Sequence, residues 1–204
     1  MMLLYLHGFR SSPASAKARQ LAQALAERGR RREWACPQLP ASPREAMELA
    51  EPLARDMQRH ARANGGELTL VGSSLGGYYA TWLAERLGCR AALLNPVVHG
   101  ARDLATQVGE HLSYHDGQPF SFTAGHVDEL RAYAVARITR PCRYYLLAAT
   151  GDEVLDWREM RDHYAGARQH IIEGGDHGIS DFEHYLPGVL AFADAAADDE
   201  SIPG

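Results

Sequence analysis

A glycine-rich turn between an apolar run and a helical pattern constrains this chain more than any other feature. Leu68–Val71 is typical of a buried β-strand, and residues 75–87 are typical of a helix that ends at Gly88. Between them stands GSSLGG, residues 72–77, which fits the pattern G-x-S-x-G with Ser74 at its centre. Glycine suits the positions two before and two after the serine, because a sharp strand-to-helix turn brings them close together. The pattern predicts a serine nucleophile on that turn, the alternative being a glycine-rich turn whose serines have no chemical role.

The alternation of strand and helix extends along most of the chain. Strands are predicted at residues 1–6, 34–36, 68–71, 91–94, 144–149 and 169–173, and helices at 12–29, 42–64, 75–87, 157–164 and 182–193. Ser12 and Ser42 each precede a proline, as at a helix start, while Pro52 predicts a kink or two shorter helices. This alternation indicates an α/β fold of three layers, with a mostly parallel sheet and helices on both faces.

Length and charge exclude several classes of protein. A chain of 204 residues predicts one domain over 1–204. The net charge of −5 argues against a nucleic-acid partner. The apolar run at residues 1–6 is too short for a signal peptide or a membrane span, so we expect a cytoplasmic protein with no membrane partner. Cys36, Cys89 and Cys142 form no C-x-x-C pair and indicate free thiols.

Lysine is almost absent from the chain. Lys17 is the only one, and nearly all other positive charge is arginine, which cannot serve as a base. Schiff-base enzymes, Ser–Lys dyads and pyridoxal enzymes all need a lysine with an adjustable pKa. Because Lys17 lies in an Ala-rich helical stretch, we expect it to take no part in chemistry and these classes to be excluded.

Two residues that follow predicted strands complete the chemistry that a serine nucleophile needs. A serine hydroxyl is a weak nucleophile, so a base must lie beside it and an acid must orient that base. In α/β-hydrolases the chain order is serine, acid, histidine, each after a strand. Asp152 follows the strand at 144–149 and His177 follows the strand at 169–173. We therefore predict Asp152 as the acid and His177 as the base.

Other titratable residues remain as alternatives. Glu153 and Asp156 flank the predicted acid and could replace it, whereas Asp176 is expected to form the loop or cap a helix. His111 and His115 are spaced i, i+4 and could bind a metal if that segment were helical. No third ligand stands at a recognisable spacing, so we expect no metal site.

The first predicted strand ends in a segment that suits an oxyanion hole. Such a hole uses the backbone N–H after the nucleophile, here that of Leu75, and one from the loop after an early strand. The N–H of Phe9 is placed to supply the second donor. His7 and Gly8 are candidates for lining the substrate pocket, the alternative being a strand-ending turn with a packed histidine.

Residues 96–140 differ from the rest of the chain. They are polar, show weak periodicity and carry scattered apolar side chains, among them Phe120 and Phe122. Apolar residues that fit no single element can cover a cleft, so we expect a small lid or side wall here and name both phenylalanines as pocket candidates. The alternative is a surface insertion packed on the sheet edge.

Several segments together resemble the YqiA-like esterases, which are small bacterial α/β-hydrolases. The segments are YLHGF (5–9), SSP (11–13), PQLP (37–40), VGSSLGGYYATWL (71–83), NP (95–96), TGDEVLD (150–156) and EGGDH (173–177). The resemblance spans residue 3 to about residue 190 and implies a serine esterase without a cofactor, with Ser74, Asp152 and His177 in the triad positions. Asp176 and Ile179 depart from the family pattern, as does the VVHG that follows Pro96.

These inferences predict a serine hydrolase that cleaves small-molecule carboxylic esters, or thioesters, through a covalent acyl-enzyme. Ser74 attacks the carbonyl, His177 takes and returns the proton, and Asp152 holds the imidazole. The absence of a large lid favours short to medium acyl groups. The alternatives are an acyltransferase or thioesterase with the same triad, and a non-catalytic ligand-binding protein of the same fold.

Overall fold

The computed structural model describes residues 1–114 and 116–195, and its centre is a sheet of six parallel strands. The strand order is β2-β1-β3-β4-β7-β8, and every neighbouring pair runs parallel. The bounds are β1 (Met2–Leu6), β2 (Trp34–Ala35), β3 (Leu68–Ser73), β4 (Arg90–Leu94), β7 (Tyr144–Ala149) and β8 (Arg168–Ile172). From β1 the chain adds β2 on one side, and from β3 it adds the remaining strands on the other side, so the strand order reverses between β1 and β3. In open parallel sheets, ligands bind at such a reversal, beyond the carboxyl ends of the strands.

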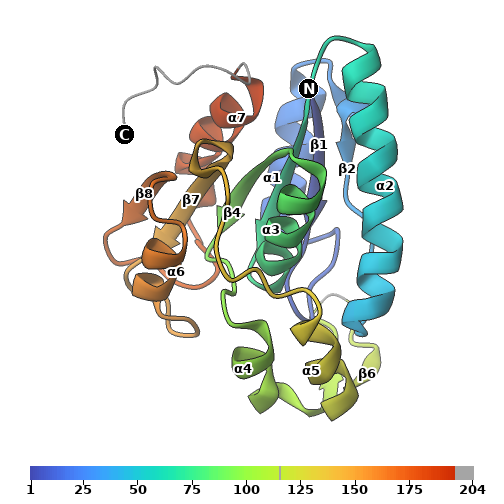
Figure 1. The fold of residues 1–204 in the computed structure, drawn as a ribbon, viewed down its shortest axis with the longest axis vertical. Coiled ribbons are helices and arrows are strands. Elements are labelled where there is room, and N and C mark those ends of the chain that lie inside the picture. The colour runs from blue at the N-terminus through green and yellow to red at the C-terminus, as the bar shows by residue number, and fades with distance from the viewer. Residues whose placement is uncertain (115, 196–204) are drawn as a thin grey trace.

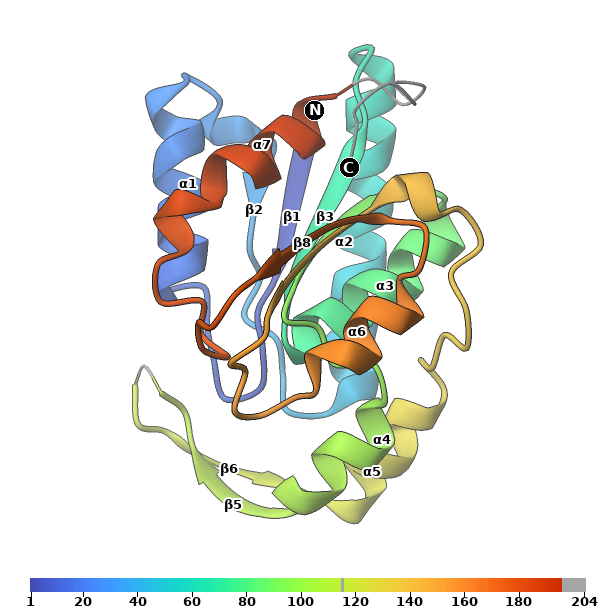
Figure 2. The ribbon, with the colours of Figure 1, turned by 90° about the vertical axis from the view of Figure 1, so that its left-hand side faces the viewer.

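Helices cover both faces of the sheet, as the sequence predicts. The bounds are α1 (Ala16–Glu27) and α7 (Leu186–Asp194) on one face, and α2 (Pro43–Ala63), α3 (Leu75–Leu87) and α6 (Trp157–His163) on the other. Figure 2 shows these layers with the sheet between them. The predicted three-layer α/β architecture is confirmed.

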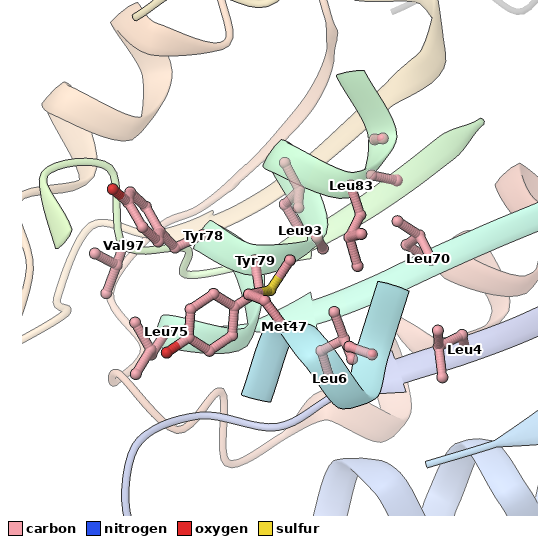
Figure 3. Packing of buried hydrophobic residues seen from close by; sticks show 14 of the residues in the cluster. Leu4, Leu6, Met47, Leu70, Leu75, Tyr78, Tyr79, Leu83, Leu93 and Val97 are labelled. Atoms are coloured by element: carbon pink, nitrogen blue, oxygen red, sulfur yellow. The ribbon is translucent and has the colours of Figure 1, made fainter. Parts of the chain in front are cut away.

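Alternation along the strands supplies a separate core for each layer. Leu4 and Leu6 of β1 belong to the core under α2 and α3, whereas Leu3 and Tyr5 belong to the core under α1 and α7. On the first face, Tyr79 of α3 packs with residues of β1 and α2 (Figure 3). Burying each large apolar side chain contributes about 1.5–3 kcal/mol, so both helical layers are held chiefly by this burial.

Two helix starts show where local patterns succeed and fail. Ser42 Oγ accepts a hydrogen bond from the N–H of Glu45 at 3.2 Å, and α2 begins at Pro43 as predicted. Ser12 Oγ instead accepts from the N–H of Ala14, which closes a tight turn, and α1 begins only at Ala16. The predicted start at Ser12 is therefore wrong, because the serine stabilises a local turn in place of a helix.

Pro52 does not divide α2. The helix is continuous from Pro43 to Ala63, so the expectation of two shorter helices is wrong. Pro52 lies on the exposed side of α2. Water can hydrogen-bond the carbonyl that the missing N–H leaves without a partner, which makes an exposed proline tolerable at this position.

Residues 96–140 form short elements beyond the carboxyl ends of the strands. These are α4 (Gly100–Leu104), an antiparallel hairpin of β5 (Gly109–Leu112) and β6 (Pro119–Phe122), and α5 (Ala124–Arg131). Figure 1 shows α4, β6 and α5 together at one end of the molecule. Periodicity was too weak to reveal them because each element is only four to eight residues long. Within the described ranges no helix combines the length and apolar character needed to cross a bilayer.

Candidate active site

Ser74 occupies a strained turn between β3 and α3. Its backbone angles are φ 55° and ψ −123°, which a residue with a side chain adopts only under constraint. A Cβ added at Gly72 would lie 2.4 Å from the carbonyl oxygen of Gly76, and one added at Gly76 would lie 1.9 Å from that of Leu6. Only glycine fits at these two positions, so the motif has the steric basis that the sequence predicts.

Two hydrogen bonds join Ser74, His177 and Asp152. Ser74 Oγ lies 3.0 Å from His177 Nε2, and His177 Nδ1 lies 2.8 Å from Asp152 Oδ2. The Asp152 side chain is fully buried, and its other oxygen accepts from the N–H groups of Val154 and Leu155 at 2.8 and 2.9 Å. Because the carboxylate can only accept, the proton on the imidazole is held at Nδ1 and Nε2 is left to accept from the serine. This arrangement can activate a hydroxyl as a nucleophile.

The three alternative acids have other contacts. Asp156 caps α6 by accepting from the N–H of Arg158 at 2.9 Å. Glu153 Oε2 accepts from the backbone N–H of His177 at 3.0 Å. Asp176 accepts from the N–H of Ser180 at 2.9 Å, in agreement with its expected role in the loop. Of these four acids, Asp152 is the one whose carboxylate contacts the imidazole.

The predicted oxyanion donors lie on both sides of the serine. A Cβ added at Gly8 would lie 3.1 Å from Ser74 Cβ, so the loop that carries Phe9 passes directly beside the nucleophile. Leu75 is the first residue of α3, where backbone N–H groups have no partner within the helix. Within the described part of the chain, neither the Phe9 nor the Leu75 N–H donates a hydrogen bond. Both N–H groups remain the predicted donors to a developing negative charge.

Asn95 organises the loop of the base, a role that the sequence analysis did not assign. It follows β4, is fully buried and has a positive φ of 42°. Its Nδ2 donates to the carbonyl oxygens of Asp176 and His177, both at 3.0 Å, and its Oδ1 accepts from the N–H of Ala149 at 2.8 Å. Asn95 thus ties the ends of β4 and β7 to the His177 loop. The available signals were its position directly after a predicted strand and the NP segment that it opens.

His7 also has a positioning role. It is buried, its Nε2 accepts from the N–H of Leu39 at 3.0 Å, and its Nδ1 lies 3.0 Å from the carbonyl oxygen of Gly8. An acceptor at Nε2 requires the neutral tautomer with the proton on Nδ1. His7 therefore fixes the loop beside Ser74 against residues 38–40.

A first cavity, the hairpin cavity, lies between the loop after β1 and the β5–β6 hairpin. Its volume is about 230 Å³, and three of the predicted pocket residues, His7, Gly8 and Phe120, line it. Phe122 is not among its lining residues: it is 1% exposed, and its ring lies 5.0 Å from that of Phe9 between centroids. Phe122 does not line this cavity, because alternation along β6 turns its side chain toward the core.

A second cavity, the α1 cavity, has a volume of about 420 Å³ and reaches from the nucleophile to the first turns of α1. Ser74 and His177 line it at one side, and Lys17 and Gln20 at the other. It shares Gly8, Phe9 and Ser11 with the hairpin cavity, so the two cavities meet beside Ser74.

Lys17 lies on a helix as predicted, yet it faces the candidate site. Its ammonium donates a hydrogen bond to the carbonyl oxygen of Gly178, directly after His177. Burial lowers the pKa of Lys17 to about 8, and the charges of Asp176 and Asp152 oppose that shift. Lys17 therefore lies beside the candidate site, which its position on a helix did not reveal.

The proposed histidine pair gives no metal site in the part that the structure describes. His111 lies in β5, which is a strand, and its Nε2 is 2.6 Å from the carbonyl oxygen of Gln107. His115 lies outside the described residues. No group of three or more potential ligands is found within residues 1–114 and 116–195.

Comparisons with known proteins identify the family and the fold of this chain. A family model described as "Uncharacterised protein family (UPF0227)" matches residues 2–194. A candidate hydrolase from Agrobacterium vitis S4 is 18% identical with a TM-score of 0.74, and the match covers 95% of this chain and 88% of that chain. Alpha/beta hydrolase domain-containing protein 10 from mouse is 15% identical with a TM-score of 0.66, covering 94% and 89%. A monoacylglycerol lipase from Paleococcus ferrophilus is 16% identical with a TM-score of 0.65, covering 94% and 93%. At these identities the likenesses show the α/β-hydrolase fold.

Proposed function

The chain belongs to the family UPF0227, the YqiA family, and from that membership and its site geometry we propose that it is a serine hydrolase of carboxylic esters. The observation that carries the proposal is the run of hydrogen bonds from Ser74 Oγ through His177 to the buried Asp152. The strained turn at Ser74 supports it, since strain of this kind is kept where a group must be presented to a substrate.

In the proposed reaction, Ser74 Oγ bonds to the ester carbonyl carbon while His177 Nε2 takes the hydroxyl proton. The N–H groups of Phe9 and Leu75 stabilise the negative charge on the carbonyl oxygen. The bond to the leaving oxygen then breaks, and His177 returns the proton to that atom. Water repeats the sequence on the acyl-enzyme and releases the acid. Every step uses groups of the chain, the ester and water, so no cofactor is required.

The hairpin cavity is proposed as the acyl pocket, and residues 96–140 as its side wall. It begins at Phe9 and Leu75, where the carbonyl would lie, and Phe120 supplies an apolar surface. Its volume of about 230 Å³ falls below the ~300–1,000 Å³ typical of pockets for drug-sized ligands. Short to medium acyl groups, on an alcohol or a thiol, fit such a space.

A fluorophosphonate probe and a set of acyl esters test the proposal together. The probe should label Ser74, and Ser74→Ala should lower ester hydrolysis at least ~10³-fold while the fold is kept. The matched variant Ser73→Ala keeps the nucleophile and should retain labelling. Labelling at Ser73, or a fully active Ser74→Ala protein, would show that the nucleophile is elsewhere. A wild-type protein that binds esters without turnover would indicate a ligand-binding protein.

A further inference from the structure

The two cavities beside Ser74 suit different halves of an ester substrate. In a serine hydrolase the base returns its proton to the leaving atom, so the leaving group must lie against the imidazole. His177 lines the α1 cavity and is not among the residues that line the hairpin cavity. The α1 cavity is therefore the place for the alcohol or thiol half of the substrate, provided that the proposed function of Ser74 holds.

The α1 cavity contains a cation whose hydrogen-bonding capacity is incompletely used. The ammonium of Lys17 has three N–H donors, and its hydrogen bond within the described residues goes to the carbonyl oxygen of Gly178. Among residues 1–114 and 116–195, no carboxylate lies within ion-pair distance of it. The two nearby acids are engaged otherwise, Asp152 with His177 and Asp176 with Ser180.

A second polar group of the same cavity is also incompletely paired. Gln20 stands three residues after Lys17 on α1, on the same side of the helix, and lines the cavity. Its Oε1 is buried and has no hydrogen-bond partner among the described residues. A buried acceptor without a partner destabilises the protein, and a ligand that offers an N–H or O–H donor can remove that cost. Both features suit a charged or polar ligand better than an acyl chain.

We propose that the α1 cavity binds a leaving group that carries a carboxylate or a phosphate, with Lys17 as its cationic partner and with Gln20 Oε1 placed to accept from an N–H or O–H group of the same ligand. The substrate class is then an ester or thioester of a short to medium acyl group with an anionic alcohol or thiol. A lysine is a compact cation that suits either anion, whereas the arginines elsewhere on the chain are not found in this cavity.

Paired esters test this specificity directly. Butanoyl esters of 4-hydroxybenzoate and 4-hydroxybenzamide share a size and differ in charge, and a third ester of 4-hydroxyphenyl phosphate represents the other anion. In Lys17→Met, kcat/KM for an anionic ester divided by that for the amide should fall at least tenfold, chiefly through KM. The control Arg19→Met removes an exposed cation of the same helix and should leave the ratio unchanged. The anionic ester with the larger fall identifies the preferred anion.

A ratio that is the same in wild type and Lys17→Met would overturn the proposal and leave Lys17 as a support for the His177 loop. Binding gives a measurement that needs neither a lysine variant nor turnover. Calorimetry on Ser74→Ala should show at least tenfold tighter binding of 4-hydroxybenzoate than of 4-hydroxybenzamide. Equal affinities there would also contradict the proposal. If the protein binds 4-hydroxybenzoate selectively but the wild type hydrolyses no ester, the proposed function is refuted, whereas the proposed anion site stands.

Discussion

Single residues fix the geometry of the site through contacts that link distant parts of the chain. Asn95 is the clearest example, since one buried side chain bonds the His177 loop and the end of β7 at once. Lys17 adds a contact from α1 to the same loop, across 161 positions of sequence. The loop that carries His177 is therefore held from two sides by residues outside the proposed triad.

Asn95→Asp should lower kcat more than it raises KM. The aspartate keeps an acceptor for the N–H of Ala149 but loses both bonds to the loop, so His177 drifts from Ser74 while the substrate pockets stay formed. We expect at least a tenfold fall in kcat and in the rate of fluorophosphonate labelling, with stability lower by about 1–3 kcal/mol. The control Asn64→Asp, at the exposed end of α2, should change neither rate. Loss of stability alone, with normal labelling, would show that Asn95 is only structural.

Asp152→Asn should slow ester hydrolysis by about four orders of magnitude. An amide at this position favours the imidazole tautomer with the proton toward Ser74, which removes the acceptor that the hydroxyl needs. Asp156→Asn is the matched change, and as an Asn cap it should cost a few tenths of a kcal/mol or less in stability. Steady-state kinetics of both variants decide the acid. An active Asp152→Asn protein would contradict the assignment.

The preference for anionic leaving groups should disappear as the pH rises through about 8. Burial lowers the pKa of Lys17 to about 8, so above this pH the amine is neutral and no longer attracts an anion. The charged and titratable groups that face it are Asp176, Asp152, His177 and the phenols of Tyr5 and Tyr114. Dividing kcat/KM for the anionic ester by that for the neutral ester cancels pH effects that the two reactions share. A ratio that stays constant from pH 7 to 10 would contradict this expectation.

At the scale of elements, the β5–β6 hairpin is the part of the structure that local patterns describe least well. Its strands have four residues each, and Phe120 and Phe122 alternate between a cavity wall and the core. The central strands β1, β3, β4 and β7 were predictable because they are buried and largely apolar. The contacts of Lys17, Asn95 and Phe122 were not, because each depends on residues brought near only by the complete fold.

Phe120→Ala and Phe122→Ala should have separate effects. Phe120 is half-buried at the hairpin cavity, so its loss should extend the longest acyl chain that is hydrolysed, at roughly 0.8 kcal/mol per methylene newly buried. Phe122 is 1% exposed, so its loss should lower the free energy of unfolding by about 3–5 kcal/mol. Chain-length profiles and urea unfolding of both variants separate the two roles. An altered profile only in Phe122→Ala would place the acyl pocket elsewhere.

At the scale of the whole molecule, the fold buries several tyrosine and cysteine side chains that ionise at alkaline pH. Burial raises the pKa of Tyr78, Cys36 and Cys89 to about 12, and it raises the pKa of Tyr5 and Tyr164 as well. Each stays protonated in the folded state at a pH where the unfolded chain has begun to lose the same proton. The folded state is therefore favoured less and less as the pH increases.

The free energy of unfolding should be nearly constant up to about pH 9 and should fall above it. The unfolded chain releases protons from cysteine near pH 9 and from tyrosine near pH 10, while the folded chain retains them. Lys17 opposes this trend weakly, because its lowered pKa makes unfolding take up a proton between about pH 8 and 10.5. Denaturant unfolding from pH 7 to 11 measures the slope, and Tyr78→Phe should reduce it. A stability that rises above pH 10 would contradict the burial of these groups.

The position of the chain's single lysine has a further consequence for protein chemistry. Reagents that acylate amines at mildly alkaline pH react with unprotonated amines, and Lys17 is the only side chain that can offer one. The amino group of Met1 lies at the opposite edge of the sheet, where it contacts Glu33 at 3.9 Å. An amine-reactive label attached to the one lysine side chain therefore lies inside the α1 cavity, far from any label on the amino group of Met1. A fluorophore or spin label on Lys17 would report on the candidate active site with no cysteine engineering.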